Sequence, residues 1–208
     1  MNTLFKLSIT GILLLTKCTI SIAQNVFETA STKDNFLIES WWVKPFDLEY
    51  KFTIFNLSAA EYNYESGQVG FMSYSILNYN VIKGFGPAIG TRLLPDKLVP
   101  LGGLQYSFYR EKFFLTANFT SEFKAQPDFE LFSIIQYRPP ITEKLKGFFQ
   151  GQFSFNFNPD GHLISFQQLR LGADFGLVQS GLAINQFQAG SEWAYDIQAG
   201  LFLRFEFQ

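Results

Sequence analysis

The sequence has little charge and no long apolar run beyond its first segment. Charged residues make up only 16% of the 208 residues, whereas a soluble domain usually carries about 25%. After residue 23, no apolar run reaches the roughly 18 residues that a transmembrane helix requires. The composition is therefore unlike that of an ordinary soluble domain and unlike that of a helical membrane protein.

Cysteine and histidine are almost absent. Cys18 is the single cysteine and lies in the N-terminal segment, so the remainder of the chain has neither a disulfide nor a thiolate metal site. His162 is the single histidine. We expect no metal site and no cofactor. The 16 basic and 18 acidic residues give a net charge of −2, which is not the charge balance of a nucleic-acid-binding protein.

Residues 1–23 have the pattern of an export signal. Lys6 provides the positive region, Leu7–Leu15 the apolar region, and Ser21-Ile22-Ala23 a small-residue cleavage site. A lipoprotein signal acylated at Cys18 is the alternative. Lys17 argues against it, because a small residue normally precedes the acylated cysteine.

Aromatic residues and period-two alternation are what the sequence has in abundance. Phe alone occurs 26 times. In the last segment every second residue is apolar over more than the 9–11 or so residues that cross a bilayer as a tilted strand. These positions are Trp193, Tyr195, Ile197, Ala199, Leu201, Leu203, Phe205 and Phe207. One face of this strand would meet lipid and the other a lumen.

Similar alternation begins at Asp47 and predicts about ten strands. They cover roughly 47–54, 68–81, 88–94, 101–109, 113–120, 129–138, 147–157, 163–175, 177–187 and 193–207. An unpaired strand edge is not stable in hydrocarbon. The prediction is therefore an all-β, closed, antiparallel, up-and-down transmembrane β-barrel over residues 46–208, with eight or twelve strands as alternatives. A soluble sandwich or lipocalin-like barrel is the competing fold.

Residues 24–45 lack a clear pattern. Asn35–Val43 reads as a short strand, a periplasmic lead-in or a plug, and Trp41-Trp42 beside Pro45 reads as an interfacial anchor or as local packing. We expect a lead-in or plug, since a single additional strand would break the even number typical of bacterial barrels.

The C-terminus resembles the insertion signal of bacterial outer-membrane proteins. That pattern has a polar residue, then a glycine, then alternating hydrophobic residues, and it is matched by Gln198, Gly200, Leu203, Phe205 and Phe207. The resemblance implies recognition by the barrel-assembly machinery, although the chain ends in Gln208 rather than an aromatic residue. The chain is also similar in style to small outer-membrane barrels of Bacteroidetes-type bacteria.

Charged residues on the opposite strand faces are candidates for lining the lumen. They are Glu49, Lys51, Arg170, Asp174, Arg204 and Glu206. Because the first and last strands adjoin in a closed barrel, Glu49 and Lys51 are expected to meet Arg204 and Glu206. Buried charges need partners, so we expect a salt-bridged filling of the lumen, with a narrow pore constriction as the alternative.

Catalysis has one candidate site, because any serine–histidine mechanism must use His162. Asp160 and Ser165 are near it in sequence, and known lipid A acyltransferase and deacylase barrels place His and Ser near the outer leaflet. Residues three apart on a regular strand point to opposite faces. The spacing therefore disfavours a His162–Ser165 pair, and we expect no enzymatic activity.

These observations predict an integral protein of the bacterial outer membrane with a structural or surface-interaction role. The alternatives are a narrow channel for small solutes and, ranked third, an outer-leaflet lipid-modifying enzyme. The loop at 59–67, with Tyr62 and Tyr64, is a candidate contact surface. Lipid, lipopolysaccharide and the assembly machinery are the expected partners, and the expected oligomeric state is a monomer.

Overall fold

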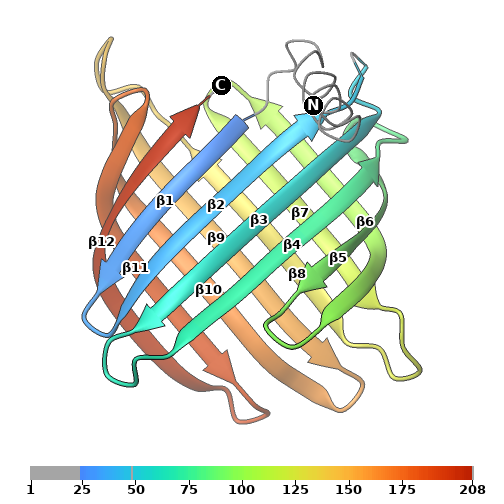
Figure 1. The fold of residues 1–208 in the computed structure, drawn as a ribbon. Helices are drawn as coiled ribbons and strands as arrows, with labels where there is room; N and C mark the ends of the chain where they lie inside the picture. Colours follow the sequence, from blue (N-terminus) through green and yellow to red (C-terminus); the bar gives the residue numbers. More distant parts are fainter. Residues whose placement is uncertain (1–23, 48, 208) are drawn as a thin grey trace, which may run out of the picture.

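The computed structural model describes residues 24–47 and 49–207 and shows a closed barrel of twelve antiparallel strands (Figure 1). Each strand pairs with its neighbours in the chain, and β1 pairs with β12. The strands are β1 Gln24–Thr32, β2 Asn35–Pro45, β3 Phe52–Asn63, β4 Val69–Tyr79, β5 Phe85–Leu93, β6 Leu98–Arg110, β7 Phe113–Glu122, β8 Phe129–Tyr137, β9 Lys146–Asn158, β10 Gly161–Asp174, β11 Val178–Ala189 and β12 Ala194–Phe207.

The start of β1 and the end of β12 lie at the same end of the barrel, which we call the terminal end. The other end is the distal end. The register between β1 and β12 runs from Asn25 opposite Phe207 to Thr32 opposite Gly200. The barrel therefore has no unpaired edge among its described strands.

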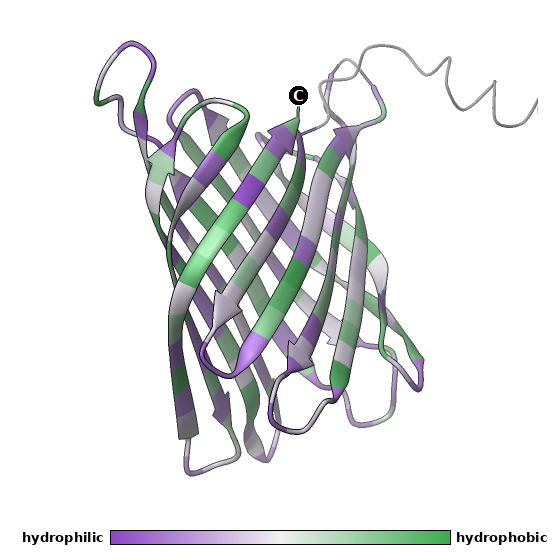
Figure 2. Ribbon diagram, turned by 60° about the vertical axis from the view of Figure 1, so that its left-hand side comes forward, coloured by the Kyte–Doolittle hydropathy of each residue, from purple (hydrophilic) through white to green (hydrophobic). Residues whose placement is uncertain are grey.

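Hydropathy alternates along most strands (Figure 2). On β12, Leu201 and Leu203 are exposed on the outer surface, whereas Phe202 and Arg204 are buried inside. This alternation follows from the period of two of a strand. It is the reverse of a soluble barrel, since the outer face is apolar and charged side chains such as Glu28, Arg170 and Arg204 are buried inside.

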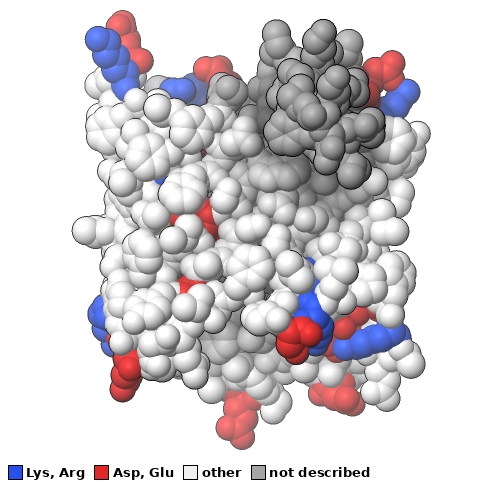
Figure 3. All heavy atoms as spheres, in the orientation of Figure 1, with Lys and Arg blue, Asp and Glu red and all other residues white. Residues whose placement is uncertain are grey.

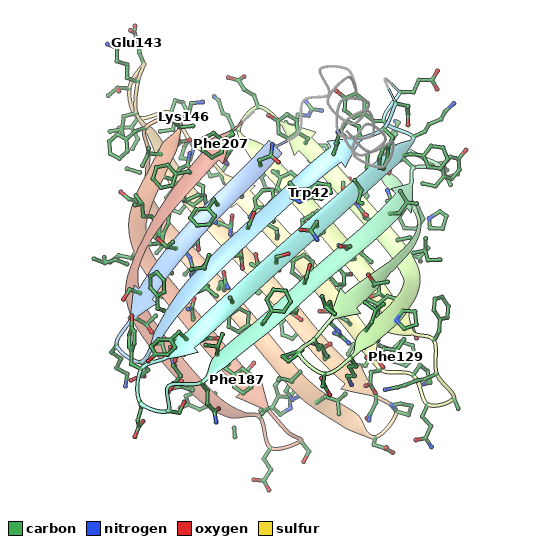
Figure 4. All side chains as sticks on the ribbon, in the orientation of Figure 1. Trp42, Phe129, Glu143, Lys146, Phe187 and Phe207 are labelled. Carbon is green, nitrogen blue, oxygen red and sulfur yellow. The ribbon has the colours of Figure 1, made fainter. Side chains whose placement is uncertain are left out.

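The outer surface has two aromatic zones with aliphatic residues between them. Trp42 and Phe207 lie toward the terminal end, and Phe129 and Phe187 toward the distal end (Figure 4). Leu77, Ile89, Leu104, Leu182 and Leu201 are exposed between these zones. Charged side chains gather mainly at the two rims (Figure 3). This pattern of an apolar band flanked by aromatic girdles is that of a transmembrane barrel.

The predicted closed up-and-down barrel is confirmed, but the strand count of about ten is wrong. The ten predicted strands correspond to β3–β12, and residues 24–45 form two further strands of the wall rather than a lead-in or plug. Two added strands keep the count even. The predicted export signal at residues 1–23 lies outside the described residues, as do Leu48 and Gln208. None of the described residues forms a helix that could cross a membrane.

The region after β2 is a connection rather than the start of a strand. Asp47 Oδ1 accepts backbone N–H bonds from Glu49 and Lys51, at 3.0 and 2.9 Å, and Oδ2 accepts one from Phe52 at 2.7 Å. The bond from Phe52 is the main reason that the pKa of Asp47 lies below its ordinary value. Asp47 therefore fixes the turn that leads into β3.

Candidate functional site

The middle of the lumen is filled by side chains. On one side the rings of Trp41, Phe55, Tyr74, Phe114 and Phe132 form what we call the aromatic layer. Trp41 stacks on Phe114 with ring centroids 5.7 Å apart, and Phe55 and Phe132 are also 5.7 Å apart. All five are buried, so this side of the lumen is closed by close packing.

The other side is closed by a charge cluster of Glu28, Arg170 and Arg204, which come from β1, β10 and β12. Arg170 Nε donates to Glu28 Oε1 at 2.7 Å, and Arg204 Nε donates to Glu28 Oε2 at 2.8 Å. All three side chains are fully buried. Arg170 also donates to Asn185 at 2.8 Å and Arg204 to Gln150 at 2.5 Å, so the charges are both paired and hydrogen-bonded.

Phe148 connects the charge cluster with the residues nearer the terminal end. The guanidinium of Arg204 lies 4.8 Å from the centre of its ring, and that of Arg138 lies 5.5 Å from it. Arg138 donates to Glu206 at 2.9 Å and lies 3.7 Å from Asp174. The structure thus places the predicted residues Arg170, Asp174, Arg204 and Glu206 inside the barrel, and Glu206 meets Arg138, the residue directly after β8.

Glu49 and Lys51 are not in the lumen, which corrects the prediction. Both side chains are mostly exposed in the β2–β3 connection, where they form an ion pair with each other. The prediction failed because β3 starts later than the alternation suggested and because β1, not β3, is the first described strand and pairs with β12. The residue opposite Arg204 on the closing pair of strands is Glu28.

A cavity of about 720 Å³ occupies the distal half of the lumen. Its deepest lining residues include Glu39, Leu57, Tyr74, Gln152 and Gln168. On the same strands the next inward residues toward the terminal end are fully buried and do not line it: Trp41, Phe55, Ile76, Gln150 and Arg170. The cavity therefore has a floor, formed by the aromatic layer and the charge cluster.

A smaller cavity of about 240 Å³ lies at the terminal end. Gln24, Phe114, Gln136, Arg138 and Glu206 are among its lining residues, and none of its lining residues is shared with the distal cavity. The aromatic layer and the charge cluster separate the two. The described residues therefore leave no open path along the barrel axis in this conformation.

The floor of the distal cavity contains polar atoms without partners. Glu39 is 1% exposed, and its Oε2 accepts bonds from Gln152 at 3.1 Å and Gln168 at 3.3 Å. Its Oε1 has no hydrogen-bond partner, and neither has Oε1 of Gln152. A buried acceptor without a partner costs free energy. The hydrogen bonds within the protein therefore do not satisfy all the polar atoms of this floor.

One wall of the cavity carries an ion-pair network. Arg92 lies 2.7 Å from Glu122 and 3.2 Å from Glu130. At the rim Lys124 lies 2.6 Å from Asp128 and 2.8 Å from Glu122. The hydrogen bond to Asp128 is the main reason that the pKa of Lys124 is raised, so this lysine stays protonated.

His162 and Ser165 do meet, contrary to the expectation from their spacing. His162 Nε2 lies 2.7 Å from Ser165 Oγ, and Nδ1 lies 2.8 Å from the carbonyl oxygen of Gly190. The pairing of β10 with β9 shifts between His162 and Ile164, and this irregularity removes the strict alternation on which the prediction depended. His162 also stacks on Trp193 with ring centroids 3.8 Å apart.

The residues that resemble an assembly signal all lie on β12, beside β1. Phe207 pairs with Asn25 and Leu203 with Thr29. Glycine is favoured at position 200 for a steric reason, because a Cβ there would lie 1.9 Å from the carbonyl oxygen of Ser31. Gln198 accepts hydrogen bonds from Thr32 and Asn35. Phe205 pairs with Phe27.

Sequence reasoning missed the two residues that organise the site, Glu28 and Glu39. Both are on the strands that lacked a clear pattern, β1 and β2. The signal that could have found them is a single acidic residue in each of the segments NVFETA and LIESWW. Neither segment contains Gly or Pro to mark a turn, so an acidic residue there is a candidate for the inner face. In the part of the chain that the structure describes, no group of three or more His, Cys, Asp or Glu side chains is placed to hold a metal ion.

No protein-family model matches the chain, and no curated protein matches its sequence. Solved structures similar to it include LpxR from Salmonella typhimurium, at 8% identity and a TM-score of 0.48, covering 88% of this chain and 100% of that one. A bacterial polysaccharide outer membrane secretin matches at 7% identity and a TM-score of 0.34, covering 91% and 100%. A Rhodopseudomonas blastica porin matches at 7% identity and a TM-score of 0.25, covering 89% and 98%. Because all three TM-scores are below 0.5, the fold assignment rests on the strand register and the outward apolar band.

Proposed function

We propose that this chain is an integral protein of the bacterial outer membrane that blocks free solute passage and binds a small ligand in its distal cavity. The observation that carries the proposal is the sealed layer between the two cavities. General diffusion requires a continuous aqueous lumen, as in larger porins. A cavity of about 720 Å³ with a floor is instead of the size that holds a small ligand.

The apolar outer band and the even strand count support the location. An even number of antiparallel strands puts the start of β1 and the end of β12 at the same end. With that end on the periplasmic side, the distal cavity would face outward. The proposed surroundings are lipid and lipopolysaccharide, the proposed state is a monomer, and insertion would use the barrel-assembly machinery through the C-terminal pattern on β12.

Solute-dependent swelling of liposomes containing the refolded protein tests the closed lumen. We expect no swelling with small sugars or amino acids, while matched liposomes with an open porin swell. A heat-induced gel mobility shift on the same sample shows that the barrel has folded. Swelling of liposomes that contain the folded protein would contradict the closed lumen and favour the alternative, a narrow channel for small solutes.

Cysteine labelling tests the orientation. In a chain with Cys18→Ser, Tyr64→Cys at the distal end is expected to react with a membrane-impermeant maleimide on intact cells. Glu143→Cys at the terminal end is expected to react only after the cells are opened. The reverse result would place the distal cavity on the periplasmic side.

A second candidate function is ester hydrolysis at Ser165. The Nδ1 contact with the Gly190 carbonyl favours a proton on Nδ1, which leaves Nε2 able to accept the proton of Ser165 Oγ. Oγ would then bond to the ester carbon, the alcohol would leave with that proton, and water would release the acid. Ser165 has no exposed surface, so this candidate ranks second. Labelling by a fluorophosphonate that is lost in both Ser165→Ala and His162→Ala would promote it.

A further inference from the structure

We propose that the ligand of the distal cavity is an organic cation, a protonated amine or guanidinium on a compact apolar body. This inference rests on the proposed ligand-binding function of the same cavity. It names the chemistry that the cavity selects, and it depends on the charge of the lining, on the unpaired atoms of the floor and on the apolar walls.

The lining of the cavity is acidic. Its cationic residues are Arg92 and Lys97, and its carboxylates are Glu39, Glu61, Glu122, Asp128, Glu130 and Asp196. Adding the neighbouring charges of Glu28, Lys124, Arg170 and Arg204 still leaves the carboxylates in excess. A cavity with low-dielectric walls and one sign of charge concentrates ligands of the opposite sign.

Most carboxylates in the wall already have a cation, whereas Glu39 at the floor has none in direct contact. Glu122 and Glu130 share Arg92. The Oε2 atom of Glu39 receives only neutral amide donors, and its Oε1 atom receives no hydrogen bond. The best-buried carboxylate of the cavity therefore has one acceptor atom that no described donor satisfies.

The second unpaired atom has the same polarity. Oε1 of Gln152 is an acceptor without a partner, and Gln152 donates its Nε2 hydrogen to Glu39. Two unpaired acceptors on side chains that are hydrogen-bonded to each other favour a ligand with several N–H donors, as an ammonium or guanidinium group has. A carboxylate or phosphate ligand would be repelled at this place.

The surroundings of the floor suit an apolar body attached to that group. Leu37, Leu57 and Met72 line the cavity, together with the rings of Tyr74 and Phe132. The ring faces of Tyr and Phe attract cations within about 6 Å. The cationic group would therefore sit at Glu39 and Gln152, with the apolar part of the ligand against these side chains.

The test uses the refolded full barrel in phosphatidylcholine nanodiscs, with empty nanodiscs as background. The probe is 2-phenylethylammonium, compared with the neutral 2-phenylethanol and the anionic 3-phenylpropanoate, and binding is measured by saturation-transfer NMR and calorimetry. We expect the ammonium probe to bind at least tenfold more tightly than the alcohol, and the carboxylate not to compete. Equal affinity for the ammonium probe and the alcohol would overturn the cation inference.

Matched variants locate the binding. Glu39→Gln is expected to weaken ammonium binding at least tenfold, while Glu143→Gln, the same change at the opposite rim, leaves it unchanged. If Glu39→Gln does not fold, Gln152→Met removes the other acceptor without changing the charge and is expected to weaken binding several-fold. Unchanged affinity in the folded floor variant would exclude the proposed position.

A cavity-filling variant separates failure of this inference from failure of the proposed function. Ala59→Trp fills the cavity and keeps every charge, so it is expected to abolish binding of the ammonium and of the alcohol. If both probes bind wild type equally and Ala59→Trp blocks both, the ligand-binding cavity stands and the cation inference fails. If Ala59→Trp blocks neither probe, binding lies outside the cavity, and both the proposed function and the cation inference are overturned.

Discussion

The aromatic layer and the charge cluster close the same cross-section of the barrel with different chemistry. The aromatic layer consists of packed rings contributed by β2, β3, β4, β7 and β8, whereas the charge cluster joins one carboxylate to two guanidinium groups from β1, β10 and β12. Loss of one packed ring leaves a void and weakens the packing, but it leaves no charge without a partner. A buried ion cluster does not tolerate loss of its only carboxylate, because two cations are then left without compensation.

The largest expected effect is that of Glu28→Ala. Removing the carboxylate leaves Arg170 and Arg204 buried, so the free energy of unfolding should fall by about 3–5 kcal/mol. Urea unfolding in lipid vesicles, followed by tryptophan fluorescence, measures it. Glu111→Ala, an exposed acid in the β6–β7 connection, is the control. A loss below about 1 kcal/mol would contradict the role assigned to Glu28.

Replacing the whole charge cluster sharpens the comparison. The variant with Glu28→Leu, Arg170→Met and Arg204→Met removes the charges together, and such replacements are often neutral or stabilising. We expect its free energy of unfolding to lie within about 2 kcal/mol of wild type. A triple variant as unstable as Glu28→Ala would mean that the cluster stabilises the barrel through more than mutual compensation.

The next prediction concerns the packing around the aromatic layer. Leu57→Ala removes a fully buried side chain that packs with the aromatic layer, and it should cost about 2–5 kcal/mol in the same unfolding measurement. Leu98→Ala, at a residue 62% exposed on β6, should change the stability little. Leu57 also lines the distal cavity. If Leu57→Ala had the same free energy of unfolding as wild type, both the packing of the aromatic layer and the position of the cavity floor would be contradicted.

A smaller effect is expected at the seam between β1 and β12. Gly200→Ala places a Cβ against the Ser31 carbonyl and should cost about 1–3 kcal/mol through overpacking. Gly70→Ala is the matched control, because the nearest atom to its added Cβ is 4.0 Å away. The folded fraction from the heat-induced mobility shift and the unfolding midpoint both report the difference. Equal losses in the two variants would contradict a special steric role for Gly200.

The smallest effect concerns the Asp47 turn. Its pKa is lower in the folded than in the unfolded chain, so its contribution is complete above the unfolded pKa and is lost as the pH falls through the folded pKa. Comparing wild type with Asp47→Asn across roughly pH 2–5 isolates this contribution. We expect the two stabilities to converge at the acid end. A constant difference across this range would show that the carboxylate charge is not involved.

Much of the fold could be predicted from the sequence, and the failures have physical causes. The segments that became β3–β12 have apolar residues on one face, which is the signal that a lipid-facing strand produces. β1 and β2 lack that contrast, because Glu28 and Glu39 share the inner face with Val26, Leu37 and Trp41. Both strands were therefore misread as a lead-in or plug.

The site was less predictable than the fold. Alternation alone placed Arg204 and Glu206 on the inner face, but it does not indicate what lies across the lumen. The contacts of Arg138 with Glu206 and of Arg170 with Glu28 join residues 68 and 142 positions apart in the chain. The irregular pairing near His162 depends on the partner strand, so spacing within β10 gave the wrong geometry for Ser165.

The position of Glu28 opposite Arg204 bears on how the closed register is chosen during assembly. A slip of one residue between β1 and β12 would turn the inner face of one strand outward. A slip of two residues would keep the faces but set Glu28 opposite Phe202 or opposite Glu206. The first leaves a carboxylate beside a ring, and the second sets two carboxylates against each other. The last described strand, β12, thus carries the counterion of the first described strand, β1, and only one alignment of the two strands neutralises both charges.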